Sequence, residues 1–167
     1  GIGIALTSTG TGAGNAAGSM VEALTAGSRV LHITGQIESE HLTPGRPEVS
    51  RGVIHEFPRQ PQLLDAISAH AATITDAKDV AAELEAAIAR IRTAPSGPAS
   101  IEWTSDLQYL ATPDMQRPSD IHAAEAVRPD EDAVARAAEL LRTARSPLIW
   151  LGGGAAGAGD QIARLAQ

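Results

Sequence analysis

The sequence contains two glycine-rich segments whose residue types and spacing are typical of turns that bind phosphate groups. One spans residues 10–15 and the other spans residues 152–157. Such a turn, placed between a strand and a helix, brings backbone N–H groups and the positive end of the helix to an anion. The second segment matches the pattern G-x-G-x-x-G of dinucleotide-binding turns, whereas the first matches neither that pattern nor a P-loop. Close packing of a helix on a strand also favours glycine, so a purely structural role stays open for both segments.

A histidine and a glutamate are adjacent at His55 and Glu56, just after a polar segment over residues 36–51. A segment of this length in a compact domain is more often functional than a plain connection. Histidine titrates near neutral pH, so His55 is a candidate for proton transfer, with a solvated surface pair as the alternative. The other four histidines lie far apart, and the chain has no cysteine and no G-x-S-x-G or H-E-x-x-H motif. We therefore predict neither a metal site nor a standard nucleophile motif in this chain.

The hydrophobic pattern around these residues predicts strands that alternate with helices. Short apolar runs predict strands over residues 1–7, 29–34, 72–75 and 99–104, and helical spacing predicts helices over 15–26, 62–69 and 79–92. This alternation is typical of an α/β fold with a parallel sheet and flanking helices. Periodicity is lost over residues 107–128, which predicts a linker, and it returns with a helix from Pro129, a strand over 147–151 and a final helix. A second α/β unit is therefore expected to begin there.

Composition argues against several classes of function. A length of 167 residues with 43% hydrophobic residues is sufficient for a folded core. Aromatic residues make up 2% and the net charge is -7, which disfavours nucleic acid as a partner because stacking side chains are scarce and phosphates are repelled. No apolar run approaches the roughly 20 residues of a membrane span, and the N-terminus lacks the charged segment of a signal peptide. We expect a cytoplasmic protein that does not associate with membranes.

Four sequence blocks together resemble thiamine diphosphate-dependent enzymes of the acetohydroxyacid (acetolactate) synthase type. The family has Thr/Ser-x-Gly-Pro-Gly-x-x-Asn before a helix, and residues 8–15 match it with Thr11 in place of proline. A strand ending in Ile-Thr-Gly-Gln is found unchanged at residues 33–36. Residues 97–106 match a Gly-Pro followed by a strand ending in Ile-Pro-x-Asp, with Thr104 in place of proline. Residues 145–154 match Arg-x-Pro-Leu-Ile-x-x-Gly-Gly-Gly, and the four blocks in register make the match specific for the superfamily.

The resemblance implies a division of the chain into three parts. Residues 1–106 would be the later part of a pyrimidine-binding domain, residues 107–128 a linker, and residues 129–167 the start of a Rossmann-like central domain. The family's catalytic glutamate precedes the glycine turn and its Gly-Asp-Gly…Asn segment for magnesium comes later, and neither has a counterpart here. We expect a full-length lyase or transferase that uses thiamine diphosphate and Mg²⁺ to decarboxylate or ligate 2-keto acids, and an inactive chain on its own.

The resemblance also assigns roles to individual residues. Ser8, Thr11 and Asn15 would lie at the pyrimidine ring of the cofactor. His55 falls where acetohydroxyacid synthases have the glutamine of a Phe-Gln-Glu motif, so we predict a catalytic role for it. A shift of a few residues in the alignment would give that role to Gln60 instead.

The central-domain glycines Gly152, Gly153 and Gly154 stand where flavin-dependent members hold FAD, and binding of FAD is left open. In the family the pyrimidine-binding domain of one subunit faces another subunit, which implies a homodimer or homotetramer. Two alternatives remain. One is a non-catalytic nucleotide-binding α/β module in which residues 152–157 bind a dinucleotide, and the other is a relative of the thiamine enzymes that has lost catalysis.

Overall fold

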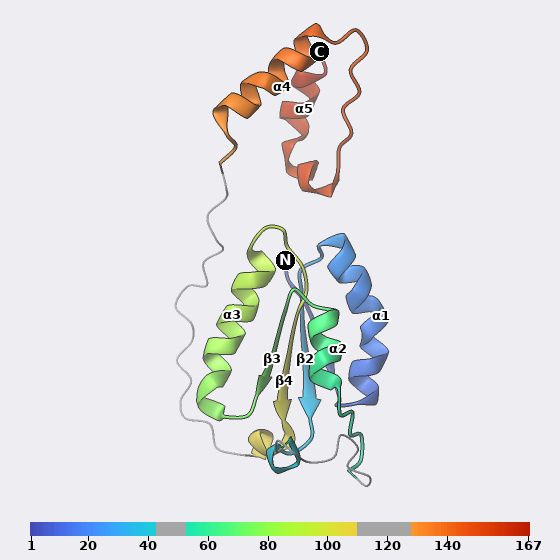
Figure 1. Cartoon of the computed structure of the whole chain (residues 1–167), viewed down its shortest axis with the longest axis vertical. Coiled ribbons are helices and arrows are strands. Elements are labelled where there is room, and N and C mark those ends of the chain that lie inside the picture. The colour runs from blue at the N-terminus through green and yellow to red at the C-terminus, as the bar shows by residue number, and fades with distance from the viewer. Residues whose placement is uncertain (43–52, 110–127) are drawn as a thin grey trace. The chain divides into compact units, whose positions relative to one another are not determined.

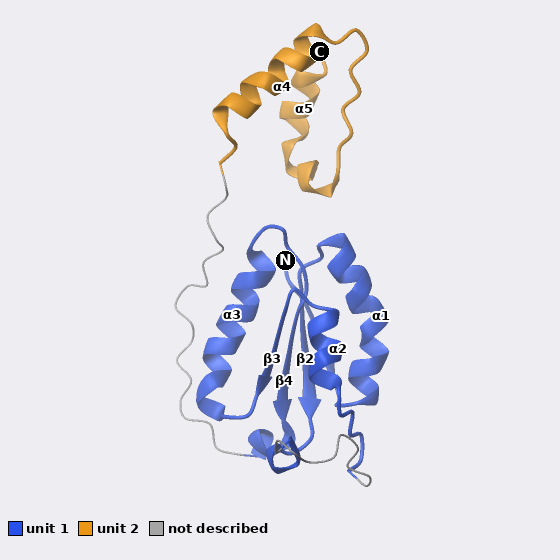
Figure 2. Ribbon diagram, in the orientation of Figure 1, with its two compact units in different colours: residues 1–126 blue, residues 127–167 orange. Residues whose placement is uncertain are grey.

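The chain consists of two compact units, residues 1–126 and residues 127–167 (Figure 2). A computed structural model describes residues 1–42, 53–109 and 128–167. Among these residues no helix is long and apolar enough to cross a membrane.

The first unit is built on a four-stranded parallel sheet with the strand order β1-β2-β4-β3. Its strands are β1 (Gly3–Thr7), β2 (Val30–Gln36), β3 (His70–Ile74) and β4 (Ala99–Thr104). Its helices are α1 (Thr11–Ala26), α2 (Gln60–Ala66) and α3 (Val80–Arg92), with short 3-10 helices η1 (Ser39–Leu42), η2 (Ala77–Asp79) and η3 (Ser105–Tyr109). Figure 1 shows α3 on one side of the sheet and α1 and α2 on the other. The predicted α/β fold with a parallel sheet and flanking helices is confirmed.

One face of the sheet is apolar and packs against α3. Leu31 of β2 lies opposite Ala99 of β4, and Ile33 lies opposite Ile101, so these side chains share a face. Ala87 and Ile91 of α3 join them in one buried cluster. This cluster is the larger of the two hydrophobic cores described in the unit, and it packs α3 against the sheet.

The opposite face is polar although it is covered. Its polar side chains from the four strands are Thr7, His32, Thr34, Gln36, Thr73, Ser100, Glu102 and Thr104. A smaller cluster of Met20 from α1 with Leu64 and Ile67, from α2 and its end, covers this face. Buried polar groups are normally hydrogen-bonded, so this face must be paired within the protein.

The edge strand β1 leaves its apolar side chains uncovered. Ile4 is 68% exposed and Leu6 is 73% exposed, while the residues of the large buried cluster come from β2, β3, β4, α3 and η3. Apolar surface of this kind at a sheet edge is suited to contact with another part of a protein or with another chain.

Several elements of the first unit differ from their predicted bounds. α2 spans Gln60–Ala66 rather than residues 62–69, and β3 spans His70–Ile74 rather than residues 72–75. α1 begins at Thr11 rather than at residue 15, because the glycines of the turn adopt helical backbone without adding apolar side chains to the pattern. β2 continues through Gly35 and Gln36, which pair with Trp103 and Thr104 of β4. The polar segment predicted over residues 36–51 therefore starts inside the sheet, and its residues 43–51 lie outside the described range.

The second unit contains α4 (Glu131–Thr143), η4 (Gly153–Ala158) and α5 (Gly159–Leu165). Asp130 caps α4, since its Oδ1 accepts a hydrogen bond of 2.6 Å from the Ala133 N–H. The predicted strand over residues 147–151 is wrong, because within residues 128–167 this stretch pairs with no other strand. A strand needs a neighbour for its backbone N–H and C=O groups, and this unit supplies none.

The proposed domain boundaries remain a prediction. The start of the predicted linker, residues 107–109, belongs to η3, where Leu107 is buried in the large cluster. Residues 110–127 lie outside the described range.

Candidate functional site

The glycine turn between β1 and α1 lies at the carboxyl edge of the parallel sheet, where α/β proteins commonly bind ligands. Gly10 has φ +62°, a backbone conformation that glycine adopts at little cost. A Cβ atom on Gly10 would overlap the carbonyl oxygen of His55. Position 10 therefore requires glycine both for its backbone angle and for the close approach of the segment that carries His55.

His55 is brought to this turn by its backbone, 45 residues further along the chain. Its own φ is +64°, a left-handed conformation that histidine adopts more readily than most residues. The residue is exposed, whereas its carbonyl faces the buried Gly10. The structure thus places the predicted catalytic residue beside the predicted cofactor-binding turn, although its role in catalysis stays a prediction.

Gln60, the alternative to His55, is fully buried. Its Oε1 accepts a hydrogen bond of 2.7 Å from the Gly10 N–H. Its Nε2 donates to the carbonyl of Gly35 at 2.8 Å and to Oε2 of Glu102 at 2.6 Å. An amide used internally at both ends is not available to a substrate, which favours His55 over Gln60 for contact with one.

Glu102 is the centre of the hydrogen bonds on the polar face and is itself fully buried. Its Oε2 accepts from Gln60 at 2.6 Å and from Gln36 Nε2 at 3.2 Å, and its Oε1 accepts from Thr73 Oγ1 at 2.6 Å. A buried carboxylate is stable only with such partners. These bonds join β2, β3 and β4 to the start of α2.

Ser8, Thr11 and Asn15 are all exposed around the N-terminal end of α1. Thr11 and Asn15 are one helical turn apart and so share a face of α1. The carbonyl of Ser8 accepts hydrogen bonds from Thr34 Oγ1 at 2.9 Å and from the Ala13 N–H at 3.1 Å, which fixes the start of the turn. The hydroxyl groups of Ser8 and Thr11 and the amide group of Asn15 remain available. Contact of these groups with a cofactor stays a prediction.

His32 lies inside the polar face rather than at the surface of the site. It is fully buried, with Nε2 2.9 Å from Thr7 Oγ1 and Nδ1 3.2 Å from Ser100 Oγ. Burial lowers the pKa of the imidazole below 6.5, because charge is unfavourable away from water. Both ring nitrogens are used within the core, as expected of a structural histidine.

Asp106 links two loops at the same edge of the sheet. It accepts hydrogen bonds from the Ser39 hydroxyl at 2.7 Å and from the Ser39 N–H at 3.0 Å. These bonds lower the pKa of its carboxyl group to about 2. The loops that follow β2 and β4 are thereby held together beside the glycine turn.

Glu38, Glu40 and His41 around η1 bring potential metal-ligand atoms within 4.8 Å of one another. The two glutamates are exposed, and exposed acidic groups commonly gather in this way without an ion. We assign no metal to them.

In the second unit, Gly152, Gly153 and Gly154 lie at the start of η4, and a Cβ atom on any of them would meet no atom within 4 Å. A dinucleotide-binding turn requires a strand before it and a helix after it. Within residues 128–167 the stretch before these glycines pairs with no strand, so the described geometry gives no support to the dinucleotide-binding alternative. A cofactor-binding role of these glycines stays a prediction.

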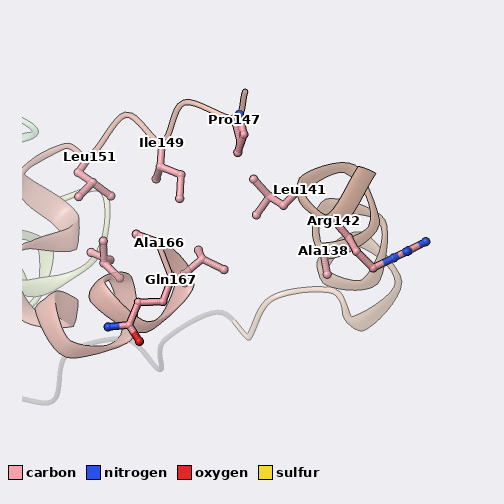
Figure 3. A pocket seen from close by; sticks show the side chains of 10 residues that line it. Ala138, Leu141, Arg142, Pro147, Ile149, Leu151, Ala166 and Gln167 are labelled. Atoms are coloured by element: carbon pink, nitrogen blue, oxygen red, sulfur yellow. The ribbon is translucent and has the colours of Figure 1, made fainter. Parts of the chain in front are cut away.

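An open hollow of about 790 Å³ in this unit is lined by α4, α5 and the extended segment between them (Figure 3). Pro147, Ile149 and Leu151 point into it, together with Leu141 of α4. Its lining is mostly apolar, and the Arg142 guanidinium is bound to the Glu139 carboxylate at 2.6 and 2.8 Å. The hollow shows a hydrophobic surface without groups arranged for chemistry.

The predictions from the sequence did not include the polar face or Glu102, and they considered Gln60 only as an alternative to His55. The signal was present in the alternation of polar and apolar residues along 30–36 and 99–104. It would have shown that one face carries His32, Gln36 and Glu102, although not that α1 and α2 bury it.

Comparison with known proteins gives two similarities, while no family model matches the chain. The chain is 23% identical over 170 residues to acetolactate synthase 1, chloroplastic, of Zea mays, which covers 99% of the chain and 25% of that protein. Its fold matches a thiamine diphosphate-dependent 4-hydroxybenzoylformate decarboxylase of Rhodococcus jostii with a TM-score of 0.69 at 17% identity. That match covers 87% of the chain and 26% of the decarboxylase. The chain spans about a quarter of each protein, and its resemblance to thiamine diphosphate-dependent enzymes is confirmed in sequence and in fold.

Proposed function

We propose that this chain supplies the pyrimidine-binding part of a thiamine diphosphate-dependent enzyme that decarboxylates or ligates 2-keto acids. The observation that carries the proposal is the packing of the His55 segment against Gly10 at the carboxyl edge of the sheet. Two segments that the resemblance assigns to one cofactor ring meet there, although 45 positions separate them in the sequence. The similarity to two such enzymes supports the same conclusion.

The residues of the turn fit a polar aromatic ring. The first turn of α1 has no acidic side chain and no side-chain cap, and its exposed polar groups come from Ser8, Thr11 and Asn15. These groups include both donors and acceptors, which a substituted aminopyrimidine requires. When bound, thiamine diphosphate would supply an electron sink for cleavage of the bond to the carboxylate.

The contribution of this chain is to bind and orient the ring and to move a proton. The glycine turn would fix the position of the ring, because hydrogen bonds hold its backbone to Gln60 and Thr34. His55 would hold or release a proton at the exposed rim of the turn, a step that glutamine at this position cannot perform. Mg²⁺ and the diphosphate would be held by other parts of the complete protein.

We further propose that the complete enzyme is a cytoplasmic homodimer or homotetramer. The exposed side chains of Ile4 and Leu6 on β1 support an interface at this edge of the first unit. In such an assembly the ring would be enclosed between this unit and a second part of the enzyme. Light scattering of the complete protein tests the assembly, and a monomer would contradict it.

The test of the function uses the protein made from the complete gene. Calorimetric titration with thiamine diphosphate and Mg²⁺ should give saturable binding, and consumption of aliphatic and aromatic 2-keto acids should depend on both. Titration with NAD and FAD serves as the comparison. Binding of a dinucleotide without thiamine diphosphate would favour the nucleotide-binding module, and cofactor binding without turnover would favour a relative that has lost catalysis.

The 167-residue chain should bind thiamine diphosphate far more weakly than the complete protein, because the proposed ligands of Mg²⁺ and the diphosphate lie outside it. Magnesium-dependent binding of about micromolar affinity by this chain alone would contradict that assignment.

A further inference from the structure

The side chain of Gln60 lies between the glycine turn and the polar face of the sheet. It contacts Gly10 at one end of its amide and both Gly35 and Glu102 at the other end. The residue is fully buried, so it reaches the turn from inside the protein.

Glu102 determines which end of the amide faces the turn. Its Oε2 lies 2.6 Å from Gln60 Nε2, and a carboxylate oxygen in this position requires a donor. The carbonyl of Gly35, 2.8 Å from the same nitrogen, imposes the same orientation. Oε1 of Gln60 must therefore point to the Gly10 N–H, which it meets at 2.7 Å.

This bond satisfies the N–H group of the residue that precedes α1. The N–H groups of Gly12 and Ala13, which an N-cap side chain would otherwise accept from, donate to the carbonyls of Thr9 and Ser8. The Gly10 N–H donates to a residue 50 positions away. The position of the turn relative to the sheet therefore depends on a side chain of α2.

We propose that Gln60, oriented by Glu102, is the positioning residue of the glycine turn and fixes where the turn presents its polar groups. It acts through the Gly10 N–H and touches neither cofactor nor substrate. The consequence for cofactor binding rests on the proposed function, whereas the effect on the turn itself does not.

The test exchanges the acid and the amide between the two positions. Gln60→Glu keeps an acceptor for Gly10 but places a carboxylate oxygen against both Glu102 and the carbonyl of Gly35. Glu102→Gln keeps an acceptor for Gln60, because its amide can turn its oxygen to Gln60 Nε2 and its NH2 group to the Thr73 hydroxyl. The double variant Gln60→Glu with Glu102→Gln restores a donor–acceptor pair between the positions, at the loss of the bonds to Gly35 and Gln36. Gln62→Glu makes the same chemical change at an exposed position of α2 and is the matched control.

The readout is amide hydrogen exchange of Gly10 in the 167-residue chain, measured by NMR. Gln60→Glu should exchange at Gly10 at least about tenfold faster than wild type, whereas Glu102→Gln and the control should exchange at a rate close to that of wild type. The double variant should be slower than Gln60→Glu by about threefold or more, which is the signature of a direct interaction between the two positions.

Unchanged exchange at Gly10 in Gln60→Glu, or a double variant no slower than Gln60→Glu, would overturn the proposal. If Gln60→Glu does not fold, the double variant decides. A folded double variant with Gly10 protected supports the proposal, and a double variant that is unfolded or unprotected at Gly10 contradicts it.

The affinity of the complete protein for thiamine diphosphate provides a second, separate test. Gln60→Glu should weaken binding of thiamine diphosphate, the double variant should recover part of it, and Gln62→Glu should not change it. If the exchange results hold but no variant affects cofactor binding, the positioning role stands and the placement of the cofactor at this turn fails.

Discussion

Substitution of Gly10 by alanine is expected to destabilise the first unit strongly. Alanine in the left-handed helical region costs about 1–2 kcal/mol, and at φ +62° and ψ -100° the backbone of position 10 is at least as unfavourable for it. Its Cβ atom would also overlap the His55 carbonyl, so the turn or the His55 segment must shift. Such a shift breaks the bond between the Gly10 N–H and Gln60, and leaving buried polar groups unpaired costs about 1–3 kcal/mol. Together these effects predict a loss of about 2–5 kcal/mol in the free energy of unfolding.

Gly14→Ala is a control in α1 that should change the free energy of unfolding in the opposite direction. Gly14 lies within α1, and a Cβ atom there would meet no atom within 4 Å. Alanine should therefore stabilise the unit by about 0.5–1 kcal/mol, since glycine is a poor helix former.

Urea unfolding followed by tryptophan fluorescence measures both changes. The chain has two tryptophans, and Trp150→Phe leaves Trp103 of β4, which packs against the large buried cluster, as the reporter of the first unit. In that background Gly10→Ala and Gly14→Ala should move the unfolding midpoint in opposite directions. A Gly10→Ala variant within about 0.5 kcal/mol of its background would refute the described geometry of the turn.

Three further predictions concern single residues of the site and its supports. The carboxyl group of Asp106 has a pKa of about 2 when folded against 3.8 in its ordinary state, so its contribution to stability is present above pH 3.8 and lost as the pH falls towards 2. Asp106→Asn should remove that part of the acid dependence in urea titrations, and an unaltered acid profile would count against the Ser39 contact. Burial lowers the pKa of His32 below 6.5, so the folded state binds fewer protons than the unfolded chain and stability should fall as the pH drops below 6.5. His32→Gln should flatten this slope, whereas a slope equal to that of wild type would mean that His32 is not its source. In the complete enzyme, His55→Gln should lower kcat by roughly 10²–10⁴-fold with little change in Tm, and unchanged turnover would show that His55 is a surface residue without a catalytic role.

The parts of the fold that the sequence predicted well are those with a local signal. The strand predicted over residues 99–104 has the same bounds as β4. The helix predicted over residues 79–92 matches α3 except for its first residue, which belongs to η2. In both stretches the spacing of apolar residues decides the element without help from distant residues. The strand predicted over 147–151 had the same local signal but has no neighbouring strand within its unit, so local pattern alone was insufficient.

The candidate site was predictable only in part, because its assembly is not local. The glycine turn and His55 were found from residue type and from the resemblance, but their contact joins positions 45 residues apart. Gln60 carries no motif of its own, and its role emerges only when α2 places it between Gly10 and Glu102. Long-range contacts of this kind leave no periodic signal in the sequence.

We propose that the glycine turn and the His55 segment form the surface that receives the aminopyrimidine ring. The most direct test is an NMR titration of the ¹⁵N-labelled 167-residue chain with thiamine diphosphate at millimolar concentration, which detects weak binding by the shift of individual amide signals. We expect concentration-dependent shifts at residues 8–15 and 53–60, with the signals of α3 and of residues 152–157 unaffected. Shifts confined to residues 152–157, or none at the glycine turn, would contradict this proposal.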